Sequence, residues 1–219
     1  MVTLKQVRAD GELMAFIDAA NEQLKGLGYT EHGQRHGSRT SEVAGDILSV
    51  LGYSEREVEL ARIAGYLHDV GNLINRQRHP LTGALLAFEG LKRLGMAPRD
   101  LALVMGAIGN HEEEQGVPVS PVAAAVVLAD KADVHRSRVQ NPSMADFDIH
   151  DRVNYAATSA AVVVDETERT IALHLVIDTQ FASVLNYFEI FLSRMGMMRD
   201  AARVLGCEYR LVINDVRLS

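Results

Sequence analysis

The sequence predicts a mainly α protein: a helical bundle followed by a small C-terminal α+β extension. Apolar residues recur at helical spacing from residue 12 to about residue 131. The period changes after about residue 155, where β-branched runs alternate with polar turns. No stretch is rich enough in Gly, Ser or Pro to act as a linker. We therefore expect two parts, residues 1–155 and 156–219, with the second packed on the first and not independent of it.

Two helix starts in the first part are marked by residue types that favour helix N-termini. Ser54 is followed three residues later by Glu57, which predicts a capping box. Ser120 precedes Pro121, which predicts an N-cap and a first helical residue. These starts fix the phase of the helices that follow, so the direction of each side chain can be predicted.

The C-terminal part is predicted to contain a hairpin, a long helix and a final strand. The runs "TSAAVVV" and "TIALHLVID" flank the polar "DETER", which predicts the hairpin. Residues 181–206 carry apolar side chains at amphipathic spacing, and "EYRLVIND" predicts the last strand. His174 alternates out of the apolar face of its strand, so we expect it on the other side of the sheet.

Composition limits the class of protein. The chain has 219 residues, 47% of them hydrophobic, which is enough for one sizeable core. The 22 Lys and Arg against 29 Asp and Glu give a net charge of −7, which argues against broad nucleic-acid binding. The single cysteine, Cys207, excludes an intramolecular disulfide framework, and no apolar run has membrane length. We expect a cytoplasmic protein that does not bind membranes.

Ionisable side chains fall on the inward-facing, apolar side of four successive predicted helices. They are His36, His68, His111 and Asp130, with Asp69 about 100° further round its helix. A single histidine on such a face is usually a satisfied core residue, and a chance coincidence at helix ends is the alternative for the whole set. Burying several unpaired carboxylates and imidazoles is costly, however. The set therefore predicts a shared transition-metal cation, because neutral imidazole and carboxylate are ligands for such ions.

The ordered set resembles the HD superfamily of metal-dependent phosphohydrolases, which is named for an adjacent His-Asp pair. Here that pair is His68 and Asp69 in "AGYLHDVGN". His36 precedes it, and "LADKADV" around Asp130 is similar to the family's last ligand motif. The match covers most of the helical region and not the tail.

Two further stretches extend the resemblance. "RHPLTGALL" is similar to the His-Pro-x-x-Gly stretch of the cyclic-di-nucleotide phosphodiesterase branch, and "GNHEEE" places a histidine where members with two metals have another ligand. The resemblance implies a binuclear site with one bridging carboxylate. Its implied ligands are His36, His68 and Asp130 on one metal, His79 and His111 on the other, and Asp69 on both.

The departures from that branch limit the function that the resemblance implies. Asn72 and Asn110 stand where the phosphodiesterase branch usually has a lysine and a histidine, so we do not assign cyclic-di-nucleotide cleavage. The implied activity is metal-dependent hydrolysis of a phosphate ester or anhydride of a nucleotide or another small phosphorylated compound. Iron or manganese is favoured, with zinc, cobalt and nickel as alternatives. A mixed-valence di-iron oxygenase and a non-catalytic ligand-sensing HD module are the competing functions.

Basic residues close to the implied ligands are candidates to bind the phosphate groups of the substrate. They are Arg76, Arg78, Lys131, Arg136 and Arg138. An ordinary solvated face is the alternative for each. The candidate catalytic residues are Asp69, Lys131 and Asp133, although Asp133 is equally suited to a hydrogen bond that orients a ligand.

The remaining polar residues receive simpler interpretations. We expect His32 and His150 at the surface, while His135 could line the pocket. The acid run at 112–114 is interpreted as a solvated helix end, with a contact between Glu112 and the ligands as the alternative. Gly71 is expected to leave room beside the metals. Residues 134–155 lack a clear period and are candidates for a cover over the site or an oligomer contact, and a homodimer through a strand edge is left open.

Overall fold

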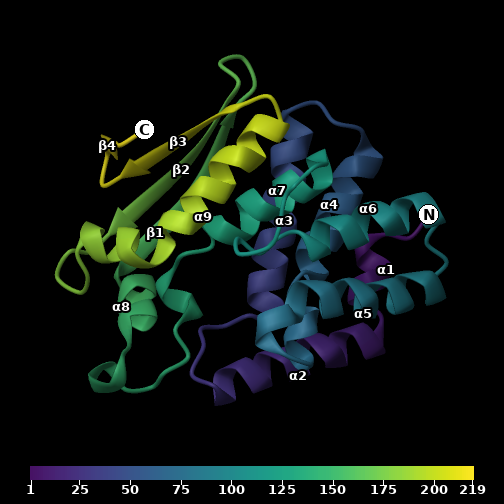
Figure 1. Ribbon diagram of the computed structural model, residues 1–219, viewed down its shortest axis with the longest axis horizontal. Helices are drawn as coiled ribbons and strands as arrows, with labels where there is room; N and C mark the ends of the chain where they lie inside the picture. Colours follow the sequence, from purple (N-terminus) through teal and green to yellow (C-terminus); the bar gives the residue numbers. More distant parts are fainter.

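The computed structural model describes residues 1–219 and begins with seven helices that form a bundle (Figure 1). They are α1 (Leu4–Arg8), α2 (Gly11–Gly26), α3 (Gln34–Val50), α4 (Glu55–Leu67), α5 (His79–Arg93), α6 (Pro98–Gly109) and α7 (Pro121–Ala132). Two 3-10 turns, η1 (Val70–Leu73) and η2 (Arg76–Arg78), connect α4 to α5. The predicted capping box at Ser54 and the predicted start at Ser120 and Pro121 are both present.

Helix α7 lies at the centre of the molecule. Every residue from Val122 to Ala132 is buried, and the helix packs against α3, α4, α6 and α9. Its Ala and Val side chains are small, which lets four neighbours approach one helix closely. A charged residue on α7 therefore points into protein whichever way it faces, so Asp130 and Lys131 need partners within the chain.

A segment of short elements connects the bundle to the C-terminal sheet. It holds the 3-10 turns η3 (Arg136–Arg138) and η4 (Met144–Asp146) and then α8 (Ile149–Ala156). The sequence pattern missed α8, whose two turns are too short to show a clear period. The predicted part boundary after residue 155 falls at the junction of α8 and the first strand.

The C-terminal part contains the predicted hairpin, long helix and final strand. The strands are β1 (Ala157–Asp165), β2 (Thr170–Ile177), β3 (Glu208–Ile213) and β4 (Val216–Arg217), and the helix is α9 (Val184–Val204). The sheet order is β1-β2-β3-β4, with β2 and β3 parallel across α9 and the other pairs antiparallel. His174 is exposed between buried neighbours, as its alternation predicts.

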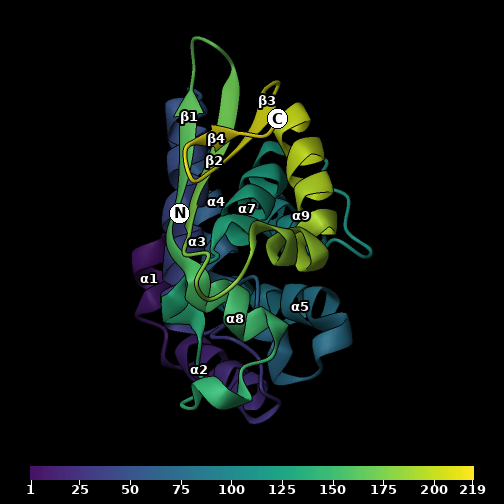
Figure 2. The ribbon, with the colours of Figure 1, turned by 90° about the vertical axis from the view of Figure 1, so that its left-hand side faces the viewer.

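One apolar cluster runs through both parts of the chain. It includes Leu48 and Leu128 from the bundle and Leu173, Met198 and Leu211 from the C-terminal part. Figure 1 shows α9 lying between the sheet and α7, and Figure 2 shows it from the side, at the opposite end of the molecule from α2. Helix α9 thereby reaches the end of α7 that carries Asp130. None of the helices combines the length and apolar character needed to cross a bilayer.

Candidate metal centre

Four histidine rings converge inside the bundle, each delivered by a different helix or helix end. His36 lies in the first turn of α3, His68 caps the C-terminus of α4, His79 begins α5 and His111 follows α6. All four are at most 1% exposed. Neighbouring ring centroids are 4.9 Å apart along the series His36, His68, His111, His79. The four helices thus meet at one buried point.

The outer nitrogen of each ring is held by an oxygen. His36 Nδ1 lies 2.6 Å from Asp133 Oδ2, and His68 Nδ1 lies 2.8 Å from the carbonyl oxygen of Gly65. His79 Nδ1 lies 2.8 Å from the carbonyl oxygen of Arg76, and His111 Nδ1 lies 2.6 Å from that of Ile108. Because these partners only accept hydrogen bonds, each Nδ1 is assigned the proton. Each neutral ring is then left with a lone pair on Nε2, which is the arrangement found in metal-ligating histidines.

The inner nitrogens face one another at distances that require a cation between them or beside them. His36 Nε2 is 3.1 Å from His68 Nε2, and His79 Nε2 is 2.9 Å from His111 Nε2. Two unprotonated nitrogens repel at such a separation, and a shared proton or a bound metal ion relieves this repulsion. An amino group of Arg76 lies beside the second pair, 3.3 Å from His79 Nε2. Neutral imidazoles and carboxylates in this arrangement fit divalent transition-metal ions.

Asp69 stands between the two histidine pairs. Its Oδ2 lies 3.4 Å from His36 Nε2 and 3.2 Å from His68 Nε2. Its Oδ1 lies 3.3 Å from His79 Nε2 and 3.9 Å from His111 Nε2. Oδ2 is also buried without a hydrogen-bond partner. One carboxylate therefore offers one oxygen to each pair, and a bound cation would satisfy the oxygen that has no partner.

Asp130 completes the first pair. Its Oδ1 is 3.2 Å from His36 Nε2 and 3.5 Å from His68 Nε2. The groups close enough to hold an ion are His36 with His68 and Asp130, His68 with Asp69 and His111, and His79 with His111 and Glu112. The structure thus brings together all six of the ligands that the sequence pattern implied, and adds Glu112.

The charges in the cluster favour ionised carboxylates. Burial alone would raise the pKa of Asp69, but His68 holds that pKa well below its ordinary value. Burial alone would also raise the pKa of Asp130, but the charge of Lys131 prevails and lowers it. Burial also lowers the pKa of His79 to about 4, and that of His111 as well. Burial lowers the pKa of His68, but Asp69 and Asp130 prevail and raise it to about 10. Two anionic carboxylates that hold a proton on a buried imidazole are suited to bind a cation in its place.

Asp69 is held in place by the turn that follows it. The sequence placed it on the same helix as His68, whereas α4 ends at Leu67 and Asp69 leads into η1. The amide of Asn72, itself fully buried, donates to both the backbone carbonyl and Oδ1 of Asp69, each at 2.9 Å. Asn72 was noted in the sequence only as a departure from another branch, and the structure assigns it this positioning contact.

Gly71 serves α5 and not the metals. A Cβ at this position would overlap the carbonyl oxygen of His79 and the backbone nitrogen of Gly83. The space expected beside the metals is therefore taken by the first turn of α5. This close backbone approach is what brings His79 within reach of Asp69.

Asp133 contacts a ligand and does not face the interior of the cluster. Its Oδ2 lies 2.6 Å from His36 Nδ1 and 2.7 Å from an amino group of Arg35. The backbone carbonyl of Asp133 accepts a hydrogen bond from Arg138 at 3.0 Å. Of the two roles that the sequence left open, the geometry favours the hydrogen bond that orients His36 over direct catalysis.

Lys131 is surrounded by carboxylates. Its Nζ lies 3.0 Å from Asp130 Oδ2, 2.6 Å from Glu113 Oε2 and 3.6 Å from Glu112 Oε1. The side chain is only 3% exposed. Carboxylates of the chain therefore balance its charge. The geometry favours a role in positioning Asp130 over the phosphate contact that the sequence predicted.

The acid run after His111 is not a solvated helix end. Residues 112–114 form a turn, and Glu112 and Glu113 are partly buried against the cluster. Glu112 Oε2 is 3.4 Å from His79 Nε2, and burial raises the pKa of Glu112 to about 7. Burial opposes the shift at Glu113, whose pKa Lys131 lowers. The position of Glu112 next to His111 had suggested a contact with the ligands as the alternative interpretation, whereas no sequence signal separated Glu113 from the exposed Glu114.

A cavity of about 360 Å³ opens beside the cluster. Two of its lining residues connect it to the ligands. Arg76 has an amino group 3.3 Å from His79 Nε2 and 4.0 Å from Asp69 Oδ1, and the ring centroid of His32 lies 5.6 Å from that of His36. His32 was predicted at the surface, and this prediction was wrong, because its ring packs beside that of His36 and lines the cavity. The lining is Leu27, Gly28, Tyr29, Thr30, His32, Arg76, Arg138, Asp148, His150, Asn154, Phe191 and Arg194.

The other predicted phosphate contacts lie elsewhere. Arg136 is exposed and stacks 5.2 Å from the ring centroid of Tyr155. Arg78 is exposed and lines a different cavity. Arg138 borders the 360 Å³ cavity, but each of its three nitrogens donates to a backbone carbonyl, of Glu31 or of Asp133. Only Arg76 of the five basic candidates faces both the ligands and the cavity.

The other two histidines of the segment after Asp130, His135 and His150, lie outside the cluster. His135 contacts the hydroxyl of Ser137 and the carbonyl of Thr158, and it borders a separate hollow that Arg35 and Asp133 also line and none of the six ligands does. His150 is 56% exposed, as expected, although it lies at the rim of the 360 Å³ cavity.

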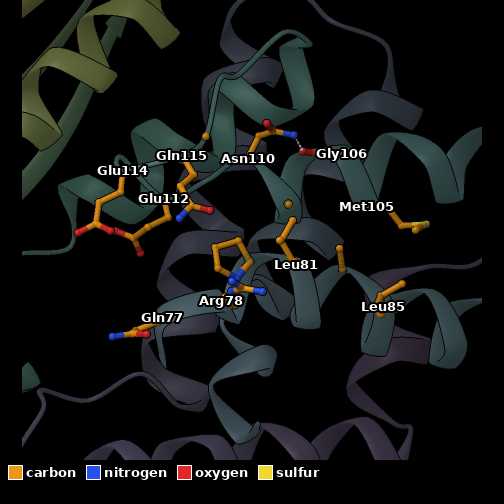
Figure 3. A pocket seen from close by; sticks show the side chains of 14 residues that line it. Gln77, Arg78, Leu81, Leu85, Met105, Gly106, Asn110, Glu112, Glu114 and Gln115 are labelled. Atoms are coloured by element: carbon orange, nitrogen blue, oxygen red, sulfur yellow. Dashed lines mark hydrogen bonds between the residues drawn. The ribbon is translucent and has the colours of Figure 1, made fainter. Parts of the chain in front are cut away.

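A second hollow, of about 520 Å³, lies between α5 and α6 (Figure 3). Glu112 and Glu114 border it at one end and Leu81, Leu85 and Met105 at the other. Its one cationic lining residue is Arg78. This hollow is less suited to a phosphorylated compound than the cavity that Arg76 lines.

Comparison with known proteins identifies the helical part. Residues 34–134 match the family model described as the HD domain, and all six implied ligands lie within that stretch. The uncharacterized protein MJ1020 of Methanocaldococcus jannaschii is 25% identical over 189 residues, which covers 75% of this chain and 72% of that protein.

Ribonuclease Y proteins from several bacteria are also similar. The protein from Thermosipho melanesiensis is 29% identical over 157 residues, covering 65% of this chain and 28% of that protein. The protein from Streptococcus agalactiae serotype III is 29% identical over 154 residues, which cover 65% of this chain and 27% of that protein. The chain thus corresponds to about a quarter of the length of these ribonucleases.

Proposed function

We propose that this chain, whose residues 34–134 match the model of the HD domain, is a metal-dependent phosphohydrolase of the HD superfamily. It would hydrolyse a phosphate ester or anhydride of a small compound, with a nucleotide as the favoured class, at a binuclear metal centre. The observation that carries the proposal is the position of Asp69. Its two oxygens face two separate histidine pairs, so one residue can join two metal ions. Two-metal sites are a common solution for phosphoryl transfer.

The cation requirement follows from the donors themselves. Four Nε2 atoms and two ionised carboxylates surround one buried point, where Asp69 Oδ2 has no hydrogen-bond donor in the chain. Asn72, Lys131 and Arg76 contact other atoms of the set, namely Asp69 Oδ1, Asp130 Oδ2 and His79 Nε2. Iron or manganese suits this set of imidazoles and carboxylates, and zinc, cobalt and nickel are alternatives. Divalent ions bound there would polarise the phosphoryl oxygens and offset the charge that develops in the transition state.

The residues of the chain would bind and position the substrate. Arg76 lies where a phosphoryl oxygen could reach both the guanidinium and the cluster, and its planar amino groups match such oxygens. Asp133 and Asn72 would hold His36 and Asp69 in their orientations. Lys131 would keep Asp130 ionised and fixed.

Cavity size favours a small substrate. About 360 Å³ lies at the lower end of the range for small-molecule sites, which is large enough for a mononucleotide. The similar ribonuclease Y proteins are named for action on RNA, and this chain covers about a quarter of their length. The net charge of −7 offers no broad surface for a nucleic-acid backbone.

The test combines metal analysis with a substrate panel on one purified sample. We expect two metal ions per chain and phosphate release from nucleotides or a generic aryl phosphate after loading with manganese or iron. His79→Ala should bind one ion fewer, whereas His174→Ala, which changes an exposed histidine on the sheet, should keep both.

Three results would contradict the proposal. A metal-loaded sample that is silent on phosphomonoesters, diesters and anhydrides would remove the hydrolase function. Cleavage of an RNA oligonucleotide in strong preference to nucleotides would replace the small substrate. Turnover that requires oxygen and two irons in a mixed-valence state would identify an oxygenase on the same ligand set.

A further inference from the structure

The cavity beside the cluster is built almost entirely from residues outside the HD domain. Of its twelve lining residues, only Arg76 lies between 34 and 134. The others come from the loop before α3, from the segment around α8 and from α9. The metal ligands and the cavity wall therefore have separate origins in the chain, and residues that choose the substrate can be sought in the wall.

Arg194 of α9 is the wall residue best prepared to bind an anion. Its Nε donates to Glu113 Oε1 at 3.2 Å, and its guanidinium carbon lies 4.4 Å from the ring centroid of Phe191. These two contacts fix the plane of the guanidinium. Its two terminal amino groups bond no acceptor of the chain, and the side chain is 22% exposed toward the cavity. A held guanidinium with free amino groups is suited to phosphate or carboxylate.

The other cationic groups of the wall are already engaged. Arg138 gives all three nitrogens to backbone carbonyls. Burial lowers the pKa of His32 well below its ordinary value, so this ring is neutral near pH 7. Asp148 is the one carboxylate of the lining, and it lies 3.5 Å from His150 Nδ1. Two arginines with donors to spare remain, one at the ligands and one on α9.

A chain of ion pairs separates Arg194 from the ligands. Asp130 contacts Lys131, Lys131 contacts Glu113, and Glu113 contacts Arg194. Arg76, in contrast, approaches His79 and Asp69 directly. A phosphate that reacts at the cluster would meet Arg76, whereas Arg194 is placed to meet a second group of the same molecule.

We propose that Arg194 is a specificity-determining residue that binds a second anionic group, so that the preferred substrate carries two such groups, the reacting phosphate beside Arg76 and another phosphate or carboxylate at Arg194. This inference deepens the proposed function and relies on it only for the identity of the reacting phosphate. The ring of Phe191 stacks on the guanidinium of Arg194 and restricts the rotamers of Arg194.

The experiment compares bisphosphates with matched monophosphates. Binding of an alkanediol bisphosphate series, from two to six carbons, and of the corresponding alkyl monophosphates is measured by calorimetry on the metal-loaded full chain. We expect at least one bisphosphate to bind about tenfold or more tightly than its monophosphate. Arg194→Gln should reduce that ratio toward one, and Arg194→Lys should retain part of it because the charge is kept. Arg199→Gln, on the exposed side of the same helix, should leave the ratio unchanged.

The outcomes separate this inference from the proposed function. Equal affinity of the wild-type protein for both series would overturn the second anion site. A loss of affinity for both series to the same extent in a folded Arg194→Gln protein would show that Arg194 acts only through Glu113 and Lys131, and would also overturn it. Phosphate release from the same compounds is measured separately. A preserved binding preference in a protein that is also silent on the panel of phosphomonoesters, diesters and anhydrides would refute the phosphohydrolase and leave the role of Arg194 intact.

Discussion

The ligand cluster and the cavity wall beside it are built in different ways. The ligands come from four helices and helix ends within residues 34–134, are almost completely buried, and each histidine is held by an oxygen acceptor. The wall comes from loops and from α9, is partly exposed, and keeps donors without partners. The proposed chemistry therefore depends on the core of the bundle, and the proposed choice of substrate depends on what is packed onto that core.

Replacing the shared ligand should have the largest effect. Asp69→Ala removes the carboxylate that faces both histidine pairs, so we expect both ions to be lost. Activity should fall by about 10³-fold, since metal stabilisation of the transition state amounts to several kcal/mol. Metal content by mass spectrometry and initial rates give the answer. Unchanged metal content would break the bridging assignment, and Glu114→Ala, in the exposed part of the neighbouring turn, is the control.

The substitution Gly71→Ala should have the next largest effect, which is a loss of protein stability. The new methyl group would overlap the backbone at His79 and Gly83, which neither side can relieve by a rotamer change. We expect the free energy of unfolding to fall by about 3 kcal/mol, as for overpacked cores. Urea denaturation measures it. Gly106→Ala, where a Cβ meets nothing within 4 Å, should stabilise its helix by up to about 1 kcal/mol. A free energy of unfolding in Gly71→Ala equal to that of the wild type would show that the backbone around Gly71 can accommodate the added methyl group, and would contradict the close approach.

Asp133→Asn should weaken metal binding without abolishing it. The amide can still accept from His36 Nδ1 but no longer carries the charge that orients the ring and balances Arg35. Loss of such a contact typically costs about 10–100-fold in metal affinity. Competition with a chelator measures it, with Asp46→Asn, whose side chain is 71% exposed, as the control. An affinity equal to that of the wild type would mean that α3 alone orients His36.

The smallest effect is expected at Arg136, and it tests the division between cluster and surroundings. Arg136→Gln removes a group that stacks on Tyr155 away from the ligands, so kcat/KM should change by less than about twofold, as for an exposed surface position. Arg76→Gln should lower kcat/KM by about tenfold or more, because a charge-assisted contact to the substrate is lost. Equal effects in the two variants would place the phosphate contacts outside the cavity described above.

Much of the fold and the inward direction of the ligands could be predicted from the sequence. The apolar stripes of α3 and α7 fixed the faces on which His36 and Asp130 lie, and the caps at Ser54 and Ser120 fixed the helix starts. The predicted hairpin, long helix and final strand are present. The segment with α8 escaped prediction because a helix of two turns carries too few apolar positions to define a period.

The sequence by itself determined which residues face the core, because helical periodicity converts position along the chain into direction around an axis. It could not determine where a side chain points once the chain leaves a helix. His32 was therefore expected at the surface, and Arg136 was expected at the site although it is exposed against Tyr155. The contact of Glu112 with the ligands was only the alternative to a solvated helix end. Only the tertiary structure decided that Asp69 stands between two histidine pairs and that Arg194 reaches the cavity from α9. Both positions depend on how elements far apart in the sequence pack against one another, and a local sequence pattern does not encode such packing.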